Sequence, residues 1–256
     1  MIHPTALVHP KAELASDVSV GAYSIIGEQV TIGPGTVIGD HVTISGKTTI
    51  GARNHIHNFC ALGGIPQDKK FHGENTALEI GNDNTIREFC TFNIGTVDDV
   101  GVTRLGDHNW IMAYVHLAHD CQVGNHTTFA NNATLAGHVR VDDWVILGGF
   151  VGVHQFVQVG AHSFLGISAV VTQDVPPYIM LAGHPAAPHG INSEGLRRRG
   201  FSAEDIAAIK RAYRKLYRSS LSLEQARDEL VQLARESARV QPMVDFLDRS
   251  TRGIVR

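Results

Sequence analysis

The 256-residue sequence lacks the features of an exported, membrane-spanning or nucleic-acid-binding protein. No apolar run reaches about 18 residues, the length at which a transmembrane helix becomes a candidate. The opening MIHPTALVHP has neither the basic nor the apolar region of a signal peptide. The net charge is only −3, and no nucleic-acid-binding motif occurs. We therefore predict a cytoplasmic protein with no transmembrane segment and no nucleic-acid partner.

Cysteine is also scarce, and its spacing excludes the usual metal and redox motifs. The three cysteines, Cys60, Cys90 and Cys121, are about thirty residues apart and form no CxxC pair. Each lies two residues before a large apolar residue of the repeat described next. We predict that all three are small buried core residues, because a free cysteine packs as a small hydrophobic side chain.

An apolar residue recurs at every sixth position. This period fits neither the 3.6-residue turn of an amphipathic helix nor hairpin-connected strands, and sustained self-similarity is typical of a solenoid. The i−2 positions are small and apolar, and glycine often follows position i. The repeated residues are Ile2, Val8, Leu14, Val20, Ile26, Ile32, Ile38, Ile44, Ile50, Ile56 and Leu62, then Leu105, Ile111, Leu117, Val123, Phe129, Leu135, Val141, Leu147, Val153, Val159, Leu165 and Val171.

The pattern resembles the hexapeptide repeat, whose coils form a left-handed parallel β-helix. We therefore predict an all-β solenoid of this type over residues 1–185, with excursion loops near residues 63–79 and 98–104 where the period breaks. A small α-helical C-terminal domain is predicted for residues 186–256. Two capping boxes support its helices, Ser202 with Asp205 and Ser222 with Gln225.

Basic residues gather at the start of the helical region. The stretch 197–218 holds eight of them against two acidic residues. Such a run has two interpretations, a docking surface for an acidic macromolecule or an ordinary solvated helix face.

Histidines fall on successive coils of the predicted solenoid. His119, His138 and His154 follow repeats that begin eighteen residues apart, which is one three-sided coil, so their strands stack about 4.8 Å apart. Asp120 is placed to fix the tautomer of His119. Two classes of enzyme use such a cluster: an acyltransferase with an imidazole general base, or a zinc lyase of the γ-carbonic-anhydrase type with histidine ligands.

Several segments resemble one family of acyltransferases nearly from end to end. These are PQDKKFHGE, IREFCTFNIGT, HLAHDCQVGN, NNATLAGHV, VHQF, QDVPPY, INSEGLRRRGF and STRGIVR. They are similar to the bacterial UDP-N-acetylglucosamine O-acyltransferases of lipid A biosynthesis. The resemblance implies transfer of an (R)-3-hydroxyacyl chain from acyl carrier protein to the 3-hydroxyl of UDP-N-acetylglucosamine. It also implies a homotrimer with active sites between adjacent β-helices, no metal, and no cofactor beyond the phosphopantetheine thioester of the donor.

The resemblance assigns roles to individual residues. It makes His119 the general base, Asp120 its support and Gly137 the backbone donor to the oxyanion. The positions that match substrate-contacting residues are Gln67, Asp68, Lys70, His116, His138, His154, Gln155, Asn192, Glu194 and Arg198. Of these, Asn192, Glu194 and Arg198 match the positions that contact the nucleotide.

The sequence departs from the family pattern at two places. Asn93 and Ile94 stand where many members have a His-Arg pair. Two acceptors therefore remain possible: UDP-N-acetylglucosamine, which gives an ester, and a 3-amino UDP-sugar, which gives an amide. Ile167 stands at the position that resembles the family's acyl-chain ruler, where glycine leaves a deep groove. A bulky side chain there predicts a shorter acyl chain.

Overall fold

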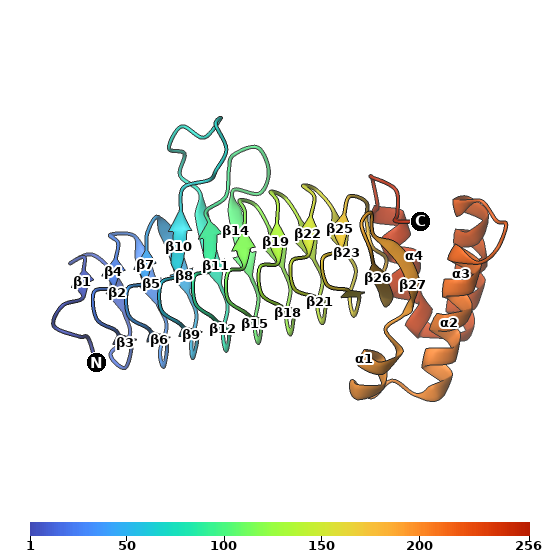
Figure 1. Ribbon diagram of the computed structural model, residues 1–256, viewed down its shortest axis with the longest axis horizontal. Coiled ribbons are helices and arrows are strands. Elements are labelled where there is room, and N and C mark those ends of the chain that lie inside the picture. The colour runs from blue at the N-terminus through green and yellow to red at the C-terminus, as the bar shows by residue number, and fades with distance from the viewer.

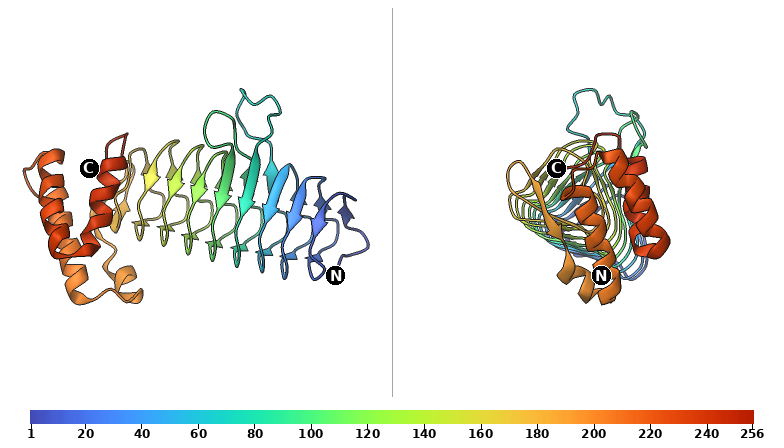
Figure 2. Two further views of the ribbon diagram at one scale, coloured as in Figure 1. Left: turned by 180° about the vertical axis from the view of Figure 1, so that it is seen from behind. Right: turned by 90° about the vertical axis from the view of Figure 1, so that its right-hand side faces the viewer.

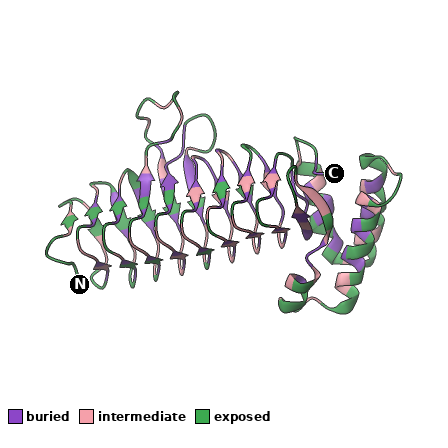
Figure 3. Cartoon of the chain, viewed as in Figure 1, coloured by how far each residue is buried: buried purple, intermediate pink, exposed green.

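A computed structural model describes all residues from Met1 to Arg256. The predicted parallel β-helix is confirmed: short strands stack coil upon coil into three parallel sheets, and four α-helices lie at the C-terminal end (Figure 1). Apart from the exposed Ile2, the apolar residues of the repeat point inward, and together they form one continuous core along the coils (Figure 3). None of the helices is long and apolar enough to cross a membrane.

The nine-stranded sheet contains every third strand from the N-terminus. Its register pairs His116 with Thr134 and Leu117 with Leu135, as the eighteen-residue coil predicts. Its strands are β1 (Leu7–Val8), β4 (Ile25–Ile26), β7 (Thr43–Ile44), β10 (Ala61–Gly64), β13 (Thr91–Asn93), β16 (His116–Leu117), β19 (Thr134–Leu135), β22 (Gly152–Val153) and β25 (Val170–Val171).

The eight-stranded sheet follows it around each coil. All of its exposed strand residues are polar. Its outward-facing residues include Glu13, Thr31, Lys47, Thr49, Glu79, Arg104, Gln122, Arg140 and Gln158. Its strands are β2 (Glu13–Leu14), β5 (Val30–Ile32), β8 (Lys47–Ile50), β11 (Ala77–Ile80), β14 (Val102–Leu105), β17 (Gln122–Val123), β20 (Arg140–Val141) and β23 (Gln158–Val159).

The ten-stranded sheet closes each coil and joins the last one to the helices. Its final strand, β27, runs antiparallel to β26, so the predicted α-helical segment 186–256 begins with a strand instead. Its strands are β3 (Ser19–Val20), β6 (Val37–Ile38), β9 (His55–Ile56), β12 (Thr85–Ile86), β15 (Trp110–Ile111), β18 (Thr128–Phe129), β21 (Ile146–Leu147), β24 (Phe164–Leu165), β26 (Ile179–Ala182) and β27 (Ala187–Ile191).

The helical region caps the open end of the coils, as the end-on view shows (Figure 2). Both predicted capping boxes are present, at Ser202 and Ser222, with each side chain bonded to the backbone three residues later. The helices are α1 (Ser193–Arg198), α2 (Ala203–Tyr217), α3 (Leu223–Glu236), the 3₁₀ turn η1 (Ala238–Val240) and α4 (Gln241–Arg249).

Two loops leave the coils side by side at one corner (Figure 1). They occupy residues 65–76, between β10 and β11, and 94–101, between β13 and β14. The second loop lies earlier than the predicted 98–104, because Val102–Leu105 pairs with Ala77–Ile80 as a regular strand. Both loops therefore project from the corner between the nine-stranded and eight-stranded sheets.

Candidate active site

The corner beneath the two loops, between the nine-stranded and eight-stranded sheets, carries the histidine cluster; we call it the site corner. Asp120, His138 and Phe156 occupy the same position on three successive coils, each in the left-handed backbone region with φ of 60°, 64° and 65°. The ring of His138 stacks on Phe156 with centroids 4.3 Å apart and meets His119 edge-on at 4.9 Å. The coil geometry thus brings the predicted His119, Asp120 and His138 together.

Asp120 is the buried centre of this corner. Its Oδ2 lies 3.0 Å from His119 Nδ1 and accepts hydrogen bonds from the backbone and the hydroxyl of Thr96, at 2.9 and 2.6 Å. Burial opposes ionisation, but the bonds from His119 and Thr96 outweigh it and lower the pKa of Asp120. An ionised carboxylate only accepts, so Nδ1 of His119 carries the hydrogen and Nε2 is left as the base.

Gly137 stands one coil above His119 and has no room for a side chain. A Cβ at this position would lie 2.5 Å from His119 Cε1 and 2.7 Å from Nε2. The Gly137 N–H makes no hydrogen bond within the chain. An imidazole base and a free N–H donor are therefore adjacent, which is the pair of groups that acyl transfer to a hydroxyl needs.

A pocket of about 590 Å³ opens between the site corner and the loops. The predicted Gln67, Asp68, Lys70 and Gln155 line it together with His119 and His138. Lys69, Asp98 and Phe156 also line it and were not predicted. The six-residue period does not predict the loop residues Lys69 and Asp98. It does predict Phe156, which has the same position in its coil as Asp120.

His116 and His154 do not line this pocket, so the groove that His154 was expected to share with His119 and His138 stays a prediction. His154 is exposed, and its Nδ1 lies 3.2 Å from the carbonyl oxygen of Gln155. It directly follows the strand residue Val153, whereas His119 and His138 lie further round the corner. His116 faces outward from β16, bonds Thr91 at 2.8 Å, and has a pKa lowered by burial.

The predicted nucleotide-contacting residues line a separate pocket of about 560 Å³ on the ten-stranded sheet. Asn192 is buried and caps α1 by accepting a hydrogen bond from Gly195 N at 3.1 Å. Glu194 and Arg198 pair at 3.0 Å. Arg199, which was not predicted, covers the Trp144 ring at 5.1 Å in the same pocket. One chain therefore keeps these residues apart from His119.

Neither departure from the family pattern enters the His119 pocket. Asn93 is buried and donates a 3.0 Å hydrogen bond to the carbonyl of Ile65, and Ile94 is part of the core. Asn93 thus anchors the first loop. Ile167 lies at the corner between the ten-stranded and nine-stranded sheets, where its side chain is exposed.

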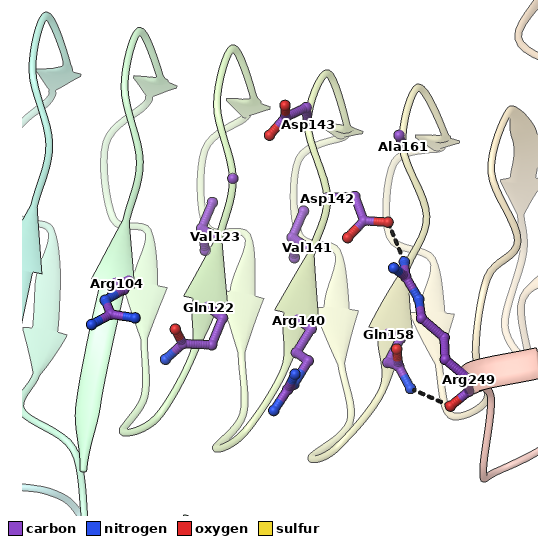
Figure 4. A pocket seen from close by; sticks show the side chains of 11 residues that line it. Arg104, Gln122, Val123, Arg140, Val141, Asp142, Asp143, Gln158, Ala161 and Arg249 are labelled. Atoms are coloured by element: carbon purple, nitrogen blue, oxygen red, sulfur yellow. Dashed lines mark hydrogen bonds and ion pairs between the residues drawn. The ribbon is translucent and has the colours of Figure 1, made fainter. Parts of the chain in front are cut away.

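A third hollow, of about 550 Å³, lies on the polar eight-stranded sheet (Figure 4). Arg249 reaches it from α4 and pairs with Asp142, and Gln158 donates to the Arg249 carbonyl at 3.2 Å. The hollow contains no histidine, cysteine or other residue with the arrangement of a general base.

The His119, Asp120 and His138 side chains offer donor atoms within 4.8 Å of one another, as a metal site requires. Asp120 Oδ2 accepts hydrogen bonds from Thr96 and faces His119 Nδ1, and only Oδ1 has no partner. However, the group contains two histidines, whereas a carbonic-anhydrase zinc site uses three. The residues therefore fit an imidazole base better than a set of zinc ligands.

A hexapeptide β-helix with an aspartate-supported histidine under two loops defines an acyltransferase of the hexapeptide class. The family model described as bacterial transferase hexapeptide (six repeats) matches residues 103–137. The model described as Udp N-acetylglucosamine O-acyltransferase; Domain 2 matches residues 174–255.

Relatives extend the likeness over the whole chain. The acyl-(acyl-carrier-protein)–UDP-N-acetylglucosamine O-acyltransferase of Thiobacillus denitrificans is 66% identical over 255 residues, covering 100% of this chain and 99% of that protein. The structure of the Francisella novicida UDP-N-acetylglucosamine acyltransferase superposes with a TM-score of 0.98 at 41% identity, covering 100% of this chain and 94% of that one. The Moraxella catarrhalis UDP-N-acetylglucosamine O-acyltransferase gives 0.97 at 44% identity, covering 100% and 99%. The chain belongs to the UDP-N-acetylglucosamine O-acyltransferase family.

Proposed function

We propose that this enzyme transfers an (R)-3-hydroxyacyl chain from acyl carrier protein to the 3-hydroxyl of UDP-N-acetylglucosamine, the first step of lipid A biosynthesis. The observation that carries this proposal is the His119 imidazole, tied through Nδ1 to buried Asp120 and lining a loop-covered pocket beside the Gly137 N–H. Family membership supplies the donor and the acceptor.

The reaction needs no covalent enzyme intermediate. His119 Nε2 removes the proton of the sugar 3-hydroxyl as that oxygen attacks the thioester carbonyl carbon. The Gly137 N–H donates to the oxyanion that develops. As the intermediate collapses, the C–S bond breaks and the His119 imidazolium returns its proton to the leaving thiolate. Asp120 keeps the ring oriented and stabilises its charge in between.

The exposed face of α2 suits the acidic acyl carrier protein. Lys210, Arg211, Arg214 and Arg218 are exposed and form no ion pair within the chain, whereas Lys215 pairs with Glu229. We place the enzyme in the cytoplasm, where its three free cysteines, all buried, stay reduced.

A homotrimer explains why one chain separates the base from the nucleotide-contacting residues. Exposed rings stack along the corner between the ten-stranded and nine-stranded sheets, which we call the aromatic corner: Tyr23, His41, Phe59, Phe89 and Tyr114, with centroids 4.8 to 5.2 Å apart. The two sheets beside it expose apolar residues such as Ile25, Val37 and Trp110, whereas the eight-stranded sheet exposes only polar ones. A large exposed apolar surface marks an interface.

Three copies with their aromatic corners inward place the nine-stranded sheet of one copy against the ten-stranded sheet of the next. At the outer end of each interface, the His119 pocket of one copy then faces the Asn192 and Arg198 pocket of its neighbour. We propose that the two pockets together form one active site.

Mixed trimers test this shared site. In a cyclic trimer that combines His119→Ala and Arg198→Ala subunits, only one of the three interfaces joins an intact His119 to an intact Arg198. We expect purified mixed trimers to regain about one third of wild-type activity, while each parent variant stays far below it. Transfer rates of differently tagged, co-expressed subunits provide the measurement. Mixed trimers no more active than their parents would mean that each chain holds a complete site.

Ile167 lies at the inner end of the same interface, next to the aromatic corner, where it is 72% exposed in the single chain. An acyl chain that starts at His119 and runs inward between the two copies meets this side chain. We expect Ile167→Gly to move the preferred donor to a chain longer by at least about two methylene groups, since each buried methylene contributes about 0.8 kcal/mol once the obstruction is gone. The measurement is kcat/KM over a series of 3-hydroxyacyl donors. Ser168→Gly, the adjacent substitution, is the control, and an unchanged preference in Ile167→Gly would refute the ruler.

The direct test of the function is transfer by the purified enzyme from 3-hydroxyacyl carrier proteins of increasing length to UDP-N-acetylglucosamine. Mass analysis and mild alkaline hydrolysis distinguish an ester from an amide. An ester product with a peak at one chain length supports the proposal. No transfer to this acceptor, but amide formation with a 3-amino UDP-sugar, would replace it.

A further inference from the structure

A second histidine–carboxylate pair lies at the active-site pocket, which His138 lines. Oδ2 of Asp99 lies 3.1 Å from Nδ1 of His138. The His138 side chain is only 9% exposed and the Asp99 side chain 28%. Asp99 belongs to the loop of residues 94–101, outside the repeat, and nothing in the hexapeptide pattern points to it.

The pair fixes which nitrogen of His138 carries the hydrogen. A carboxylate accepts hydrogen bonds only, so His138 Nδ1 donates to Asp99. Asp120 Oδ2 is 3.9 Å from the same nitrogen, which is too far for a hydrogen bond. In the neutral ring Nε2 is therefore an acceptor, as it is in His119.

The other contacts of His138 do not decide which ring nitrogen carries the hydrogen. Its backbone N–H donates to the His119 carbonyl at 3.0 Å, and its ring lies parallel to Phe156, with 4° between the planes. Stacking sets the plane of the ring, but a half-turn about the Cβ–Cγ bond keeps this plane and exchanges Nδ1 for a ring carbon. The hydrogen bond to Asp99 decides which of these two orientations the ring adopts.

We infer that Asp99 is a positioning residue: it holds His138 in the Nδ1–H tautomer, so that Nε2 accepts a hydrogen bond from a second hydroxyl of the acceptor sugar. The rings of His119 and His138 are 4.9 Å apart, a separation that suits two neighbouring hydroxyls, one deprotonated by His119 and the other held by His138. This role rests on the function proposed above.

Asp99→Asn is the critical variant, because it keeps the shape of the side chain while its amide donates to Nδ1 and moves the ring hydrogen to Nε2. We expect kcat/KM for UDP-N-acetylglucosamine to fall about 10- to 100-fold, at least as far as in Asp99→Ala, with Asp99→Glu recovering most of the loss. If Asp99 only anchored its loop, the amide would serve equally well. Near-wild-type turnover in Asp99→Asn would therefore overturn the inference. Val97→Ala, an exposed position on the same loop, is the matched control.

The tautomer itself gives a readout that does not depend on turnover. Long-range nitrogen–proton spectra of protein labelled with ¹⁵N-histidine, with the His138 signals assigned from a His138→Gln variant, should show hydrogen on Nδ1 in the wild type and on Nε2 in Asp99→Asn. A wild-type His138 with hydrogen on Nε2 would refute the Asp99 assignment. If the wild type carried hydrogen on Nδ1 but transferred no acyl group, the proposed function would be at fault and the pairing would stand.

Discussion

His119→Ala is expected to lower kcat about 10²- to 10⁴-fold, the usual contribution of a positioned general base. His138 also donates to a carboxylate, Asp99, but its ring lies against Phe156, and only the His119 ring lies directly beside Gly137. The variant should still fold: His119 is at a corner outside the continuous core, and its side chain is 15% exposed. The measurement is transfer rate under saturating donor and acceptor, with thermal unfolding of the same samples.

Cys121→Ala is the matched control for His119→Ala. Cys121 lies two residues away and is fully buried, and burial raises the pKa of its thiol to about 12, so no thiolate is available at neutral pH. Its turnover should stay close to that of the wild type. Retention of more than about a tenth of wild-type activity by His119→Ala would rule out this residue as the base.

Gly137→Ala is expected to have a comparable effect through one added methyl group. The new Cβ would lie 2.5 Å from His119 Cε1, closer than real Cβ contacts come, so the imidazole must leave its position. Gly137 is not in the left-handed backbone region, so alanine introduces no backbone strain there. We therefore expect a folded protein whose kcat is reduced at least about 100-fold, because catalysis by a positioned base depends on its geometry.

The combination of both substitutions shows whether the methyl group acts through His119. The three atoms nearest to the added Cβ all belong to the His119 ring. Gly137→Ala should therefore cause little further loss in the His119→Ala background, although it is severe alone. If the two losses multiply instead, the methyl group acts by another route, such as displacement of the oxyanion donor.

The fold was predictable because a six-residue period specifies which residues face inward on every coil. Stacking by eighteen residues also places His119 beside Gly137 and His138, which follow one coil later. His154 has another position within the repeat, immediately after its strand, so coil membership alone does not place its side chain beside His119.

Other residues of the site could not be predicted from the repeat. Thr96, which bonds Asp120, and Asp99, which bonds His138, come from a loop whose path depends on contacts with the coils and not on any period. Both boundaries of that loop differ from the predicted 98–104, since residues 94–97 leave the coil and residues 102–104 belong to the strand that pairs with β11. The repeat does not show whether His119 and Arg198 lie close together, and they line separate pockets of one chain. This separation agrees with the site between adjacent β-helices that the resemblance implies and that the proposed trimer would supply.

Because the coils stack uniformly, the distance between the site corner and the C-terminal helices can change only by whole coils. Each coil adds one strand to each sheet and about 4.8 Å along the axis, so inserting or deleting a coil between them displaces α1 by whole steps and never by a fraction. We therefore expect single side chains, such as Ile167 in the proposed site, to make the fine adjustment of substrate size. A larger change in the distance between the site corner and α1 requires the gain or loss of one whole coil of eighteen residues.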